Sequence, residues 1–450
     1  MKPSLILINP WIYDFSAYDL WSKPFGLLCL AGWLRESGFN IHFIDCLDIH
    51  HPDMTENSSL KPPKRHLYGT GKFWREVVPK PSPLQDIPRP YSRYGLLPEV
   101  FEQELRKIRK PSAILITALM TYWYPGVMEA IRLAKRVHPG VPVILGGIYA
   151  RLCHEHAVIN SGADSVVSGH GKASLLAALD EYGIRLPGNR PDLRSLAYPA
   201  FDLLTEIDYV CMMTSSGCPY RCQYCASHFL QPERVKRDPD EVLEEIVFWH
   251  QDFAVQDFAF YDDALLVAPG NHAGLLFEGL ARLNLNLRFH TPNALHVREI
   301  TGEISRLLHR TGFRTIRLGL ETSDLSLHRD LDNKLSGGDF ERAMHNLLEA
   351  GFDTRQIGAY ILIGLPGQTV DSVIETINFA GANAAIPYLS EYSPIPHTPL
   401  WEKAVACSEH DLSSEPLFHN NTLLPCWDEA KKKELLRLKR LVSEIRERYR

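Results

Sequence analysis

Three cysteines stand close together in the segment SSGCPYRCQYCASHFL, residues 215–230. Cys218, Cys222 and Cys225 are spaced C-x3-C-x2-C, although the whole chain has only nine cysteines. A structural zinc site usually pairs two C-x2-C units, and the sequence contains no second unit of this kind. Three thiolates leave one metal position open. Such an incomplete set is typical of a 4Fe–4S cluster that keeps one iron available for a chelating ligand.

The composition predicts a soluble, cytoplasmic protein of about two or three domains. The chain has 450 residues, is 45% hydrophobic and carries a formal net charge of -6, so nothing indicates a nucleic-acid partner. The longest apolar run, FGLLCLAGWL, is far shorter than the roughly 18 residues that span a bilayer, and no signal peptide is evident. An odd number of cysteines without a secretory signal favours metal or redox chemistry over a disulfide scaffold.

Residues 1–190 alternate short apolar runs with amphipathic segments. This alternation predicts an α/β fold that begins with a Rossmann-like, doubly wound domain, with ligands at the carboxyl ends of its parallel strands. The predicted strands are 5–9, 41–45, 112–117, 142–147 and 164–169. A long insertion at residues 50–97, rich in Pro, His, Lys and Tyr, interrupts the pattern; it is either a functional lid or a disordered segment.

A proline-rich connector near residues 184–205 precedes a second alternating region, residues 205–400. Six β/α units are too few for an eightfold barrel, which needs about 250 residues, so we expect a partial (β/α)6 barrel. The predicted strands are 209–215, 257–263, 287–293, 314–321, 357–364 and 388–394. Residues 401–450 form a C-terminal extension, which ends in a capping helix with an apolar stripe at Leu435, Leu438, Val442 and Ile445.

The cysteine segment resembles the signature of radical S-adenosylmethionine (SAM) enzymes, because Tyr224 stands just before the last cysteine and a predicted strand precedes the loop. The resemblance implies that the three cysteines hold a 4Fe–4S cluster and that SAM chelates its open iron. Reductive cleavage of SAM would then give a 5'-deoxyadenosyl radical. A structural zinc loop is the alternative.

Two further segments resemble SAM-binding motifs of that family. YILIGLPGQT, residues 360–369, is similar to the strand-five motif beside the adenine, which implies contacts from Gly364 and Gln368; a glutamate commonly replaces this glutamine. RLGLETSD, residues 317–324, is similar to the strand-four motif and implies that Glu321 binds the SAM ribose or amino group. The alternative for Glu321 is an ion pair with an arginine of the same strand.

The second predicted strand of the barrel departs from the family pattern. YDDALL, residues 261–266, lacks the Gly-Gly-Glu stretch that binds the SAM ammonium in many members. Asp262 or Asp263 would supply the carboxylate, and only one of them can point inward because successive strand residues face opposite sides. FHTPNALHVREIT resembles a strand-three segment of cobalamin-linked members, with candidate cavity residues His290, Asn293 and His296.

Several stretches of the first domain resemble the cobalamin-binding domain of one large radical SAM group; they are residues 8–11, 24–45, 144–150 and 162–179. Gly146, Gly147 and Gly169 lie at the carboxyl ends of predicted strands, where missing side chains let a corrin ring or its nucleotide tail approach the backbone. Tyr122 or Trp123 would shield the lower face of the corrin; the alternative is that these aromatic side chains only pack in the core or at a helix start. No D-x-H-x-x-G motif follows the first strand, as is general in cobalamin-dependent radical SAM enzymes. A domain that binds no cofactor is the alternative.

A second cluster, as in radical SAM methylthiotransferases, would require Cys29, Cys46 and Cys153. Cys29 lies among leucines in a predicted helix, as a buried cysteine would, and Cys153 lies within another predicted helix. These positions argue against a second cluster.

The resemblance therefore implies a cobalamin-dependent radical SAM enzyme that methylates an unactivated carbon of a small molecule or peptide. Its electrons would come from a low-potential donor such as flavodoxin or ferredoxin. The sequence assigns no catalytic residue. The alternatives are a radical SAM enzyme without cobalamin and a non-catalytic metal-binding module.

Overall fold

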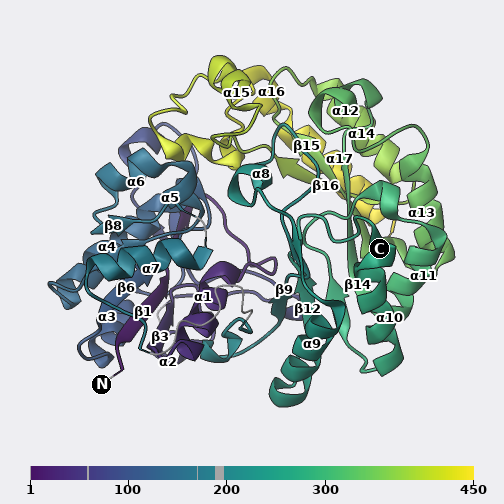
Figure 1. Cartoon of the computed structure of the whole chain (residues 1–450). Coiled ribbons are helices and arrows are strands. Elements are labelled where there is room, and N and C mark those ends of the chain that lie inside the picture. The colour runs from purple at the N-terminus through teal and green to yellow at the C-terminus, as the bar shows by residue number, and fades with distance from the viewer. Residues whose placement is uncertain (1, 58–59, 170, 188–196, 450) are drawn as a thin grey trace. The chain divides into compact units, whose positions relative to one another are not determined.

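The computed structural model describes residues 2–57, 60–169, 171–187 and 197–449. The chain divides into two compact units (Figure 1). Unit 1 comprises Met1–Asp208 with Ser413–Leu417, and unit 2 comprises Tyr209–Leu412 with Phe418–Arg450. None of the described helices has both the length and the apolar character needed to cross a membrane.

Unit 1 contains a five-stranded parallel sheet of order β3-β1-β6-β7-β8. Its strands are β1 (Ser4–Asn9), β3 (Asn40–Asp45), β6 (Ala113–Ile116), β7 (Val143–Leu145) and β8 (Ser165–Val166). All five predicted strands are present, and their order is that of a doubly wound fold. The predicted Rossmann-like architecture is therefore confirmed.

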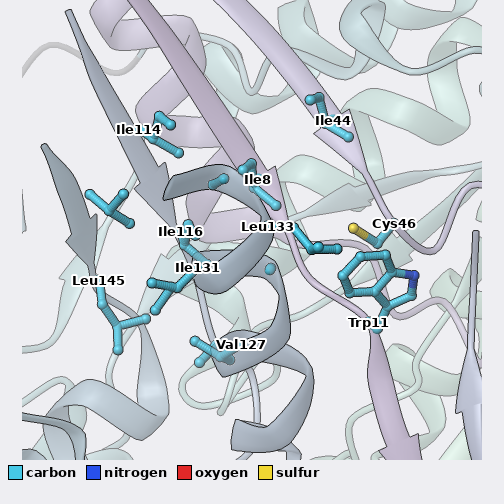
Figure 2. Packing of buried hydrophobic residues seen from close by; sticks show 14 of the residues in the cluster. Ile8, Trp11, Ile44, Cys46, Ile114, Ile116, Val127, Ile131, Leu133 and Leu145 are labelled. Atoms are coloured by element: carbon cyan, nitrogen blue, oxygen red, sulfur yellow. The ribbon is translucent and has the colours of Figure 1, made fainter. Parts of the chain in front are cut away.

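Both faces of this sheet are covered, which explains the continuous apolar runs in its strands. Ile6 and Ile8 of β1 pack with α3 (Pro98–Lys107) and α4 (Tyr124–Val137) in the core shown in Figure 2. Leu5 and Leu7 face the opposite side, where they pack with α1 (Phe25–Glu36) and α7 (Gly171–Glu181). Alternate residues of one strand thus contribute to two separate cores.

The insertion at 50–97 is folded in its described residues, so of the two alternatives, a lid or a disordered segment, disorder does not hold there. It contains α2 (Pro52–Asn57), and two of its strands join a third in an antiparallel sheet of order β2-β5-β4. These strands are β2 (Ile12–Asp14), β5 (Tyr91–Tyr94) and β4 (Arg75–Val78). Trp74 is buried beneath the sheet, and its indole Nε1 donates a 3.1 Å hydrogen bond to the carbonyl of Ile49. Short strands between prolines leave too little periodicity to be recognised in sequence.

Unit 2 is built on a six-stranded parallel sheet of order β16-β15-β14-β13-β12-β9, so each strand pairs with its neighbour in sequence. The strands are β9 (Val210–Met212), β12 (Asp257–Phe260), β13 (Arg288–His290), β14 (Phe313–Glu321), β15 (Ile357–Ile363) and β16 (Ile386–Glu391). β9 and β16 form its edges, as expected for a partial barrel.

Helices between the strands cover the outer side of this sheet (Figure 1). They include α9 (Pro239–Phe253), α10 (Ala273–Leu283), α11 (Gly302–Thr311), α13 (Asp339–Glu349) and α14 (Val370–Ala382). The last helix, α17 (Leu435–Glu447), packs on β16 and α14 with Leu438, Val442 and Ile445 buried. The predicted apolar stripe is confirmed for these three side chains.

One buried carboxylate connects two neighbouring strands of the barrel. Asp262 follows β12 and is 2% exposed. It accepts hydrogen bonds from the backbone N–H groups and the hydroxyls of Thr214 and Ser215, at 2.6 to 3.1 Å. These two residues begin the path from β9 into the cysteine segment, so Asp262 fixes the start of that segment.

A first prediction concerns the packing of α4 on the chain after β1. A Cβ atom at Gly126 would lie 2.1 Å from the carbonyl oxygen of Trp11. Gly126→Ala therefore forces backbone to move and should destabilise the fold by about 1–3 kcal/mol. The midpoint of thermal unfolding would fall. Gly26→Ala in α1, which meets nothing within 4 Å, is the control and should leave the midpoint unchanged or raise it. Equal midpoints for the two variants would contradict this account.

A second prediction concerns Asp262. Asp262→Asn replaces an acceptor oxygen with an NH2 group facing donors, which leaves buried N–H or hydroxyl groups without a partner at a cost of ~1–3 kcal/mol. We expect a lower unfolding midpoint and less iron bound per chain after reconstitution. Asp252→Asn, at an exposed position of α9, is the matched control. Normal iron content in Asp262→Asn would refute the anchoring role.

Candidate cluster and cofactor sites

Cys218, Cys222 and Cys225 lie on one loop between β10 (Ser215–Ser216) and α8 (Ser227–Leu230). β10 pairs with β11 (Val235–Lys236), which closes the loop at its base. Gly217 has a φ of +76° and a Cβ there would lie 2.5 Å from the carbonyl oxygen of Glu233, so only glycine fits at this turn. The loop follows β9 at its carboxyl end, where barrel active sites form.

The surroundings of the three thiols fit a bound metal cluster. None of the three is in a disulfide. The backbone N–H of Tyr220 donates to the sulfur of Cys218, and that of Ser227 donates to the sulfur of Cys225 at 3.4 Å. Such donors stabilise a thiolate and hydrogen-bond to cluster sulfurs. Burial raises the pKa of Cys222 to about 11, against a lowering effect of Lys334, so metal binding must release protons here.

Tyr224 anchors the loop to the segment after β14. Its hydroxyl donates to Asp332 at 3.1 Å and accepts from the Lys334 ammonium at 3.3 Å. The ammonium also lies 5.6 Å from the centre of the Tyr224 ring, in cation–π range. The predicted aromatic side chain thus belongs to a buried polar network that ends at the cluster loop.

Glu321 is the last residue of β14 and has a φ of +58°, a strained conformation for a residue with a side chain. Burial raises the pKa of its carboxyl group, with Lys334 opposing, and the carboxyl also hydrogen-bonds Tyr224. The alternative ion pair with an arginine of the strand finds no support among the described contacts. Arg317 instead lies over the ring of Tyr388, 4.5 Å from its centre. Glu321 therefore faces the cluster loop.

Gln368 closes the turn after β15. Its Oε1 accepts from the N–H groups of Gly364 and Leu365 at 2.9 and 3.3 Å, and its Nε2 donates to the carbonyl of Leu362 at 2.8 Å. An ionised glutamate has no N–H and could not donate to the carbonyl of Leu362, so the side-chain amide of Gln368 adds a hydrogen bond within the turn. Gly364 has a φ of +90° that the turn requires. We interpret Gln368 as a residue that shapes the turn rather than one that reaches the cofactor.

The carboxylate of Asp262 is likewise occupied, by Thr214 and Ser215. Its neighbour Asp263 is hydrogen-bonded to Ser227, next to Cys225. The two predicted candidates therefore both support the cysteine loop in this structure.

Unit 1 contains a cavity of about 340 Å³ at the carboxyl ends of β6, β7 and β8. Its lining includes Gly26, Thr117, Gly146, Gly147, Gly169 and Lys172. A Cβ at Gly146 would meet nothing within 4 Å, whereas one at Gly147 would lie 2.6 Å from backbone atoms of Ala118. Gly147 is thus required by the fold, and Gly146 leaves open space that suits a bulky ligand. The three predicted glycines line one cavity.

Tyr122 is not among the residues that line this cavity. It is buried in the turn Thr121–Trp123 and packs edge-on against Trp123, with ring centres 5.9 Å apart. Its observed contact is therefore packing, and a role beside a corrin stays a prediction.

The structure does not bring Cys29, Cys46 and Cys153 together. Cys46 and Cys153 belong to the core around Trp11, where Figure 2 shows Cys46 beside that indole. Cys29 lies on α1, across the sheet, and lines the glycine-rich cavity. The structure thus agrees with the sequence argument against a second cluster.

Two further residues lie near the cysteine loop; Lys334 was not assigned a role from sequence, whereas His296 was predicted as a cavity residue. Lys334 belongs to the Tyr224 network. The imidazole of His296 is buried and stacks on Tyr220, with ring centres 4.3 Å apart, and neither of its nitrogens has a partner among the described residues. No motif marks Lys334, because it reaches the loop from a segment distant in sequence.

Two family models match the chain. Residues 212–380 match the radical SAM superfamily and residues 93–179 match the B12 binding domain. The first range contains the cysteine loop and strands β12 to β15, and the second contains all three glycines of the cavity.

Curated relatives are distant in sequence. An uncharacterized methyltransferase of Pyrococcus horikoshii is 24% identical over 347 residues, which cover 69% of this chain and 74% of that protein. An anaerobic magnesium-protoporphyrin IX monomethyl ester cyclase of Rubrivivax gelatinosus is 23% identical, over 65% of this chain and 58% of that protein.

Two solved structures share the fold over most of the chain. The radical SAM methyltransferase TsrM of Kitasatospora setae superposes with a TM-score of 0.64 at 16% identity, covering 96% of this chain and 84% of that protein. The cobalamin-dependent radical SAM enzyme OxsB gives a TM-score of 0.55 at 12% identity, covering 98% of this chain and 56% of that protein.

The predicted cofactors, a 4Fe–4S cluster, SAM and cobalamin, are those of the two matched domain families. The chain therefore joins a radical SAM domain, within residues 212–380, to an N-terminal B12-binding domain, within residues 93–179.

Proposed function

We propose that the protein is a cobalamin-dependent radical SAM enzyme that transfers a methyl group to an unactivated carbon of a small molecule or peptide. The observation that carries the proposal is the loop of Cys218, Cys222 and Cys225 at the carboxyl end of β9. The glycine-lined cavity at the carboxyl ends of β6, β7 and β8 supports the cobalamin part.

The bound cofactors would supply an electron for SAM cleavage and carry the methyl group, while the protein binds and orients the reactants. The three cysteines would hold the cluster. Glu321, at the end of β14, presents a carboxyl group on the side of the cluster loop, and the turn shaped by Gln368 presents backbone at the end of β15. Gly146 leaves room for the corrinoid in unit 1.

The relatives include tRNA methylthiotransferases, such as one of Bacillus subtilis that is 21% identical over 56% of this chain. A methylthiotransferase-like second cluster is not favoured, because Cys29 and Cys46 contribute to opposite faces of the unit 1 sheet. The methyltransferase named among the relatives and TsrM favour methyl transfer. The proposal includes a cytoplasmic location, where reduced thiols persist and a flavodoxin or ferredoxin can donate electrons.

The decisive experiment is anaerobic reconstitution of the whole chain with iron and sulfide. We expect a 4Fe–4S cluster by electron paramagnetic resonance (EPR) and formation of 5'-deoxyadenosine from SAM under reduction. Cys222→Ser should lose both, because the two remaining thiolates cannot hold a 4Fe–4S cluster that binds SAM at its open iron. Cys153→Ser, which changes a cysteine of the unit 1 core, is the matched control and should keep both. An intact cluster in Cys222→Ser, or zinc in the wild type, would overturn the proposal.

Cobalamin binding is tested separately at Gly146. Gly146→Leu places a side chain in the cavity without meeting protein atoms at its Cβ, so the fold should persist while the ligand is excluded. We expect hydroxocobalamin to bind roughly tenfold more weakly or worse, which corresponds to ~1.4 kcal/mol. Gly146→Ala provides a smaller graded change. Equal binding of hydroxocobalamin by wild type and Gly146→Leu would show that this cavity is not the corrinoid site.

A further inference from the structure

Lys334 places a positive charge beside one of the cluster cysteines. It follows α12 (Leu325–Leu331), the helix after β14, and its ammonium reaches back to the cysteine loop. There it donates to the hydroxyl of Tyr224 at 3.3 Å, and its charge interacts with the thiol of Cys222. The charge therefore lies at a ligand sulfur of the proposed cluster.

The network around Lys334 holds its backbone N–H and the hydroxyl that its ammonium contacts. The carboxylate of Asp332 accepts the backbone N–H of Lys334 at 3.0 Å and the hydroxyl of Tyr224 at 3.1 Å. His328 holds the same carboxylate through Nδ1 at 2.9 Å, and its Nε2 bonds the carbonyl of Thr322 at 2.8 Å. Each of these polar side chains thus has a hydrogen-bond partner within the network.

Two carboxyl groups, those of Glu321 and Asp332, lie near the ammonium of Lys334. Loss of the ammonium would leave two carboxyl groups, those of Glu321 and Asp332, without their common cation beside the cluster loop. The charge around the cluster would then be more negative.

From this geometry we infer that Lys334 is a positioning residue that raises the reduction potential of the cluster held by Cys218, Cys222 and Cys225. The inference rests on the proposed function. In the step concerned, a reduced flavodoxin or ferredoxin loses one electron and the cluster gains it; no bond forms or breaks. A fixed cation beside a cluster sulfur stabilises the added negative charge.

The test is a redox titration of the reconstituted full-length protein, followed by EPR, before SAM is added. Lys334→Met, which keeps the length of the side chain without its charge, should shift the midpoint potential to a more negative value. Lys334→Arg should restore most of the shift, because it keeps a cation and a donor. Tyr224→Phe removes the hydroxyl partner while Lys334 remains, so its shift should be smaller. Lys403→Met, at an exposed lysine of unit 2, should have no effect.

An unchanged midpoint potential in Lys334→Met with a full cluster overturns the inference. If Lys334→Met takes up no cluster, Lys334→Gln, which retains a polar contact without charge, is titrated in its place. Failure of both variants to take up the cluster would show a structural role and also overturn the inference. Failure of the wild type to form a cubane or 5'-deoxyadenosine would instead refute the proposed function itself.

Discussion

The carboxylate of Asp262 is the interaction on which the cysteine loop depends. A buried carboxylate is stable only when donors surround it, and here Thr214 and Ser215 supply two N–H groups and two hydroxyls. The same hydrogen bonds fix the direction of the chain that leaves β9. Gly217 then turns it sharply, so that the cysteines begin at a defined point. The loop is thus held at its start by a polar contact from the neighbouring strand and at its base by the pairing of β10 with β11.

A second set of contacts reaches the same loop from the segment after β14, which lies three strands from β9 in the sheet. Tyr224, Asp332 and Lys334 connect it with the segment after β14, and His328 holds Asp332 in turn. Buried polar networks of this kind are favourable only when each member has its partners, which restricts the loop to one arrangement. The same contacts set the charge around Cys222. The contacts that fix the position of the loop are therefore also those that set the charge around its cysteines.

Both units use the carboxyl ends of parallel strands, and both need glycine there. Gly364 forms the turn after β15 and Gly147 the turn after β7, each with a positive φ. The cavity of unit 1 exists because Gly146 adds no side chain where space is open. A ligand with a large planar ring needs this kind of access to backbone.

The sequence by itself determined the strands of both main sheets, the grouping of three cysteines on one loop and the glycines of the cavity, because these depend on local spacing and on residue type. It did not determine the antiparallel sheet of residues 12–94, whose short strands pair across long separations. Nor did it show that Gln368 bonds its own turn, that Asp262 supports the cysteine loop or that Tyr122 packs in the core. Lys334 and His296 reach the loop only after β13 and β14 lie side by side. Which side chains meet across distant segments is decided by tertiary packing, since burial and hydrogen bonding act on the whole fold.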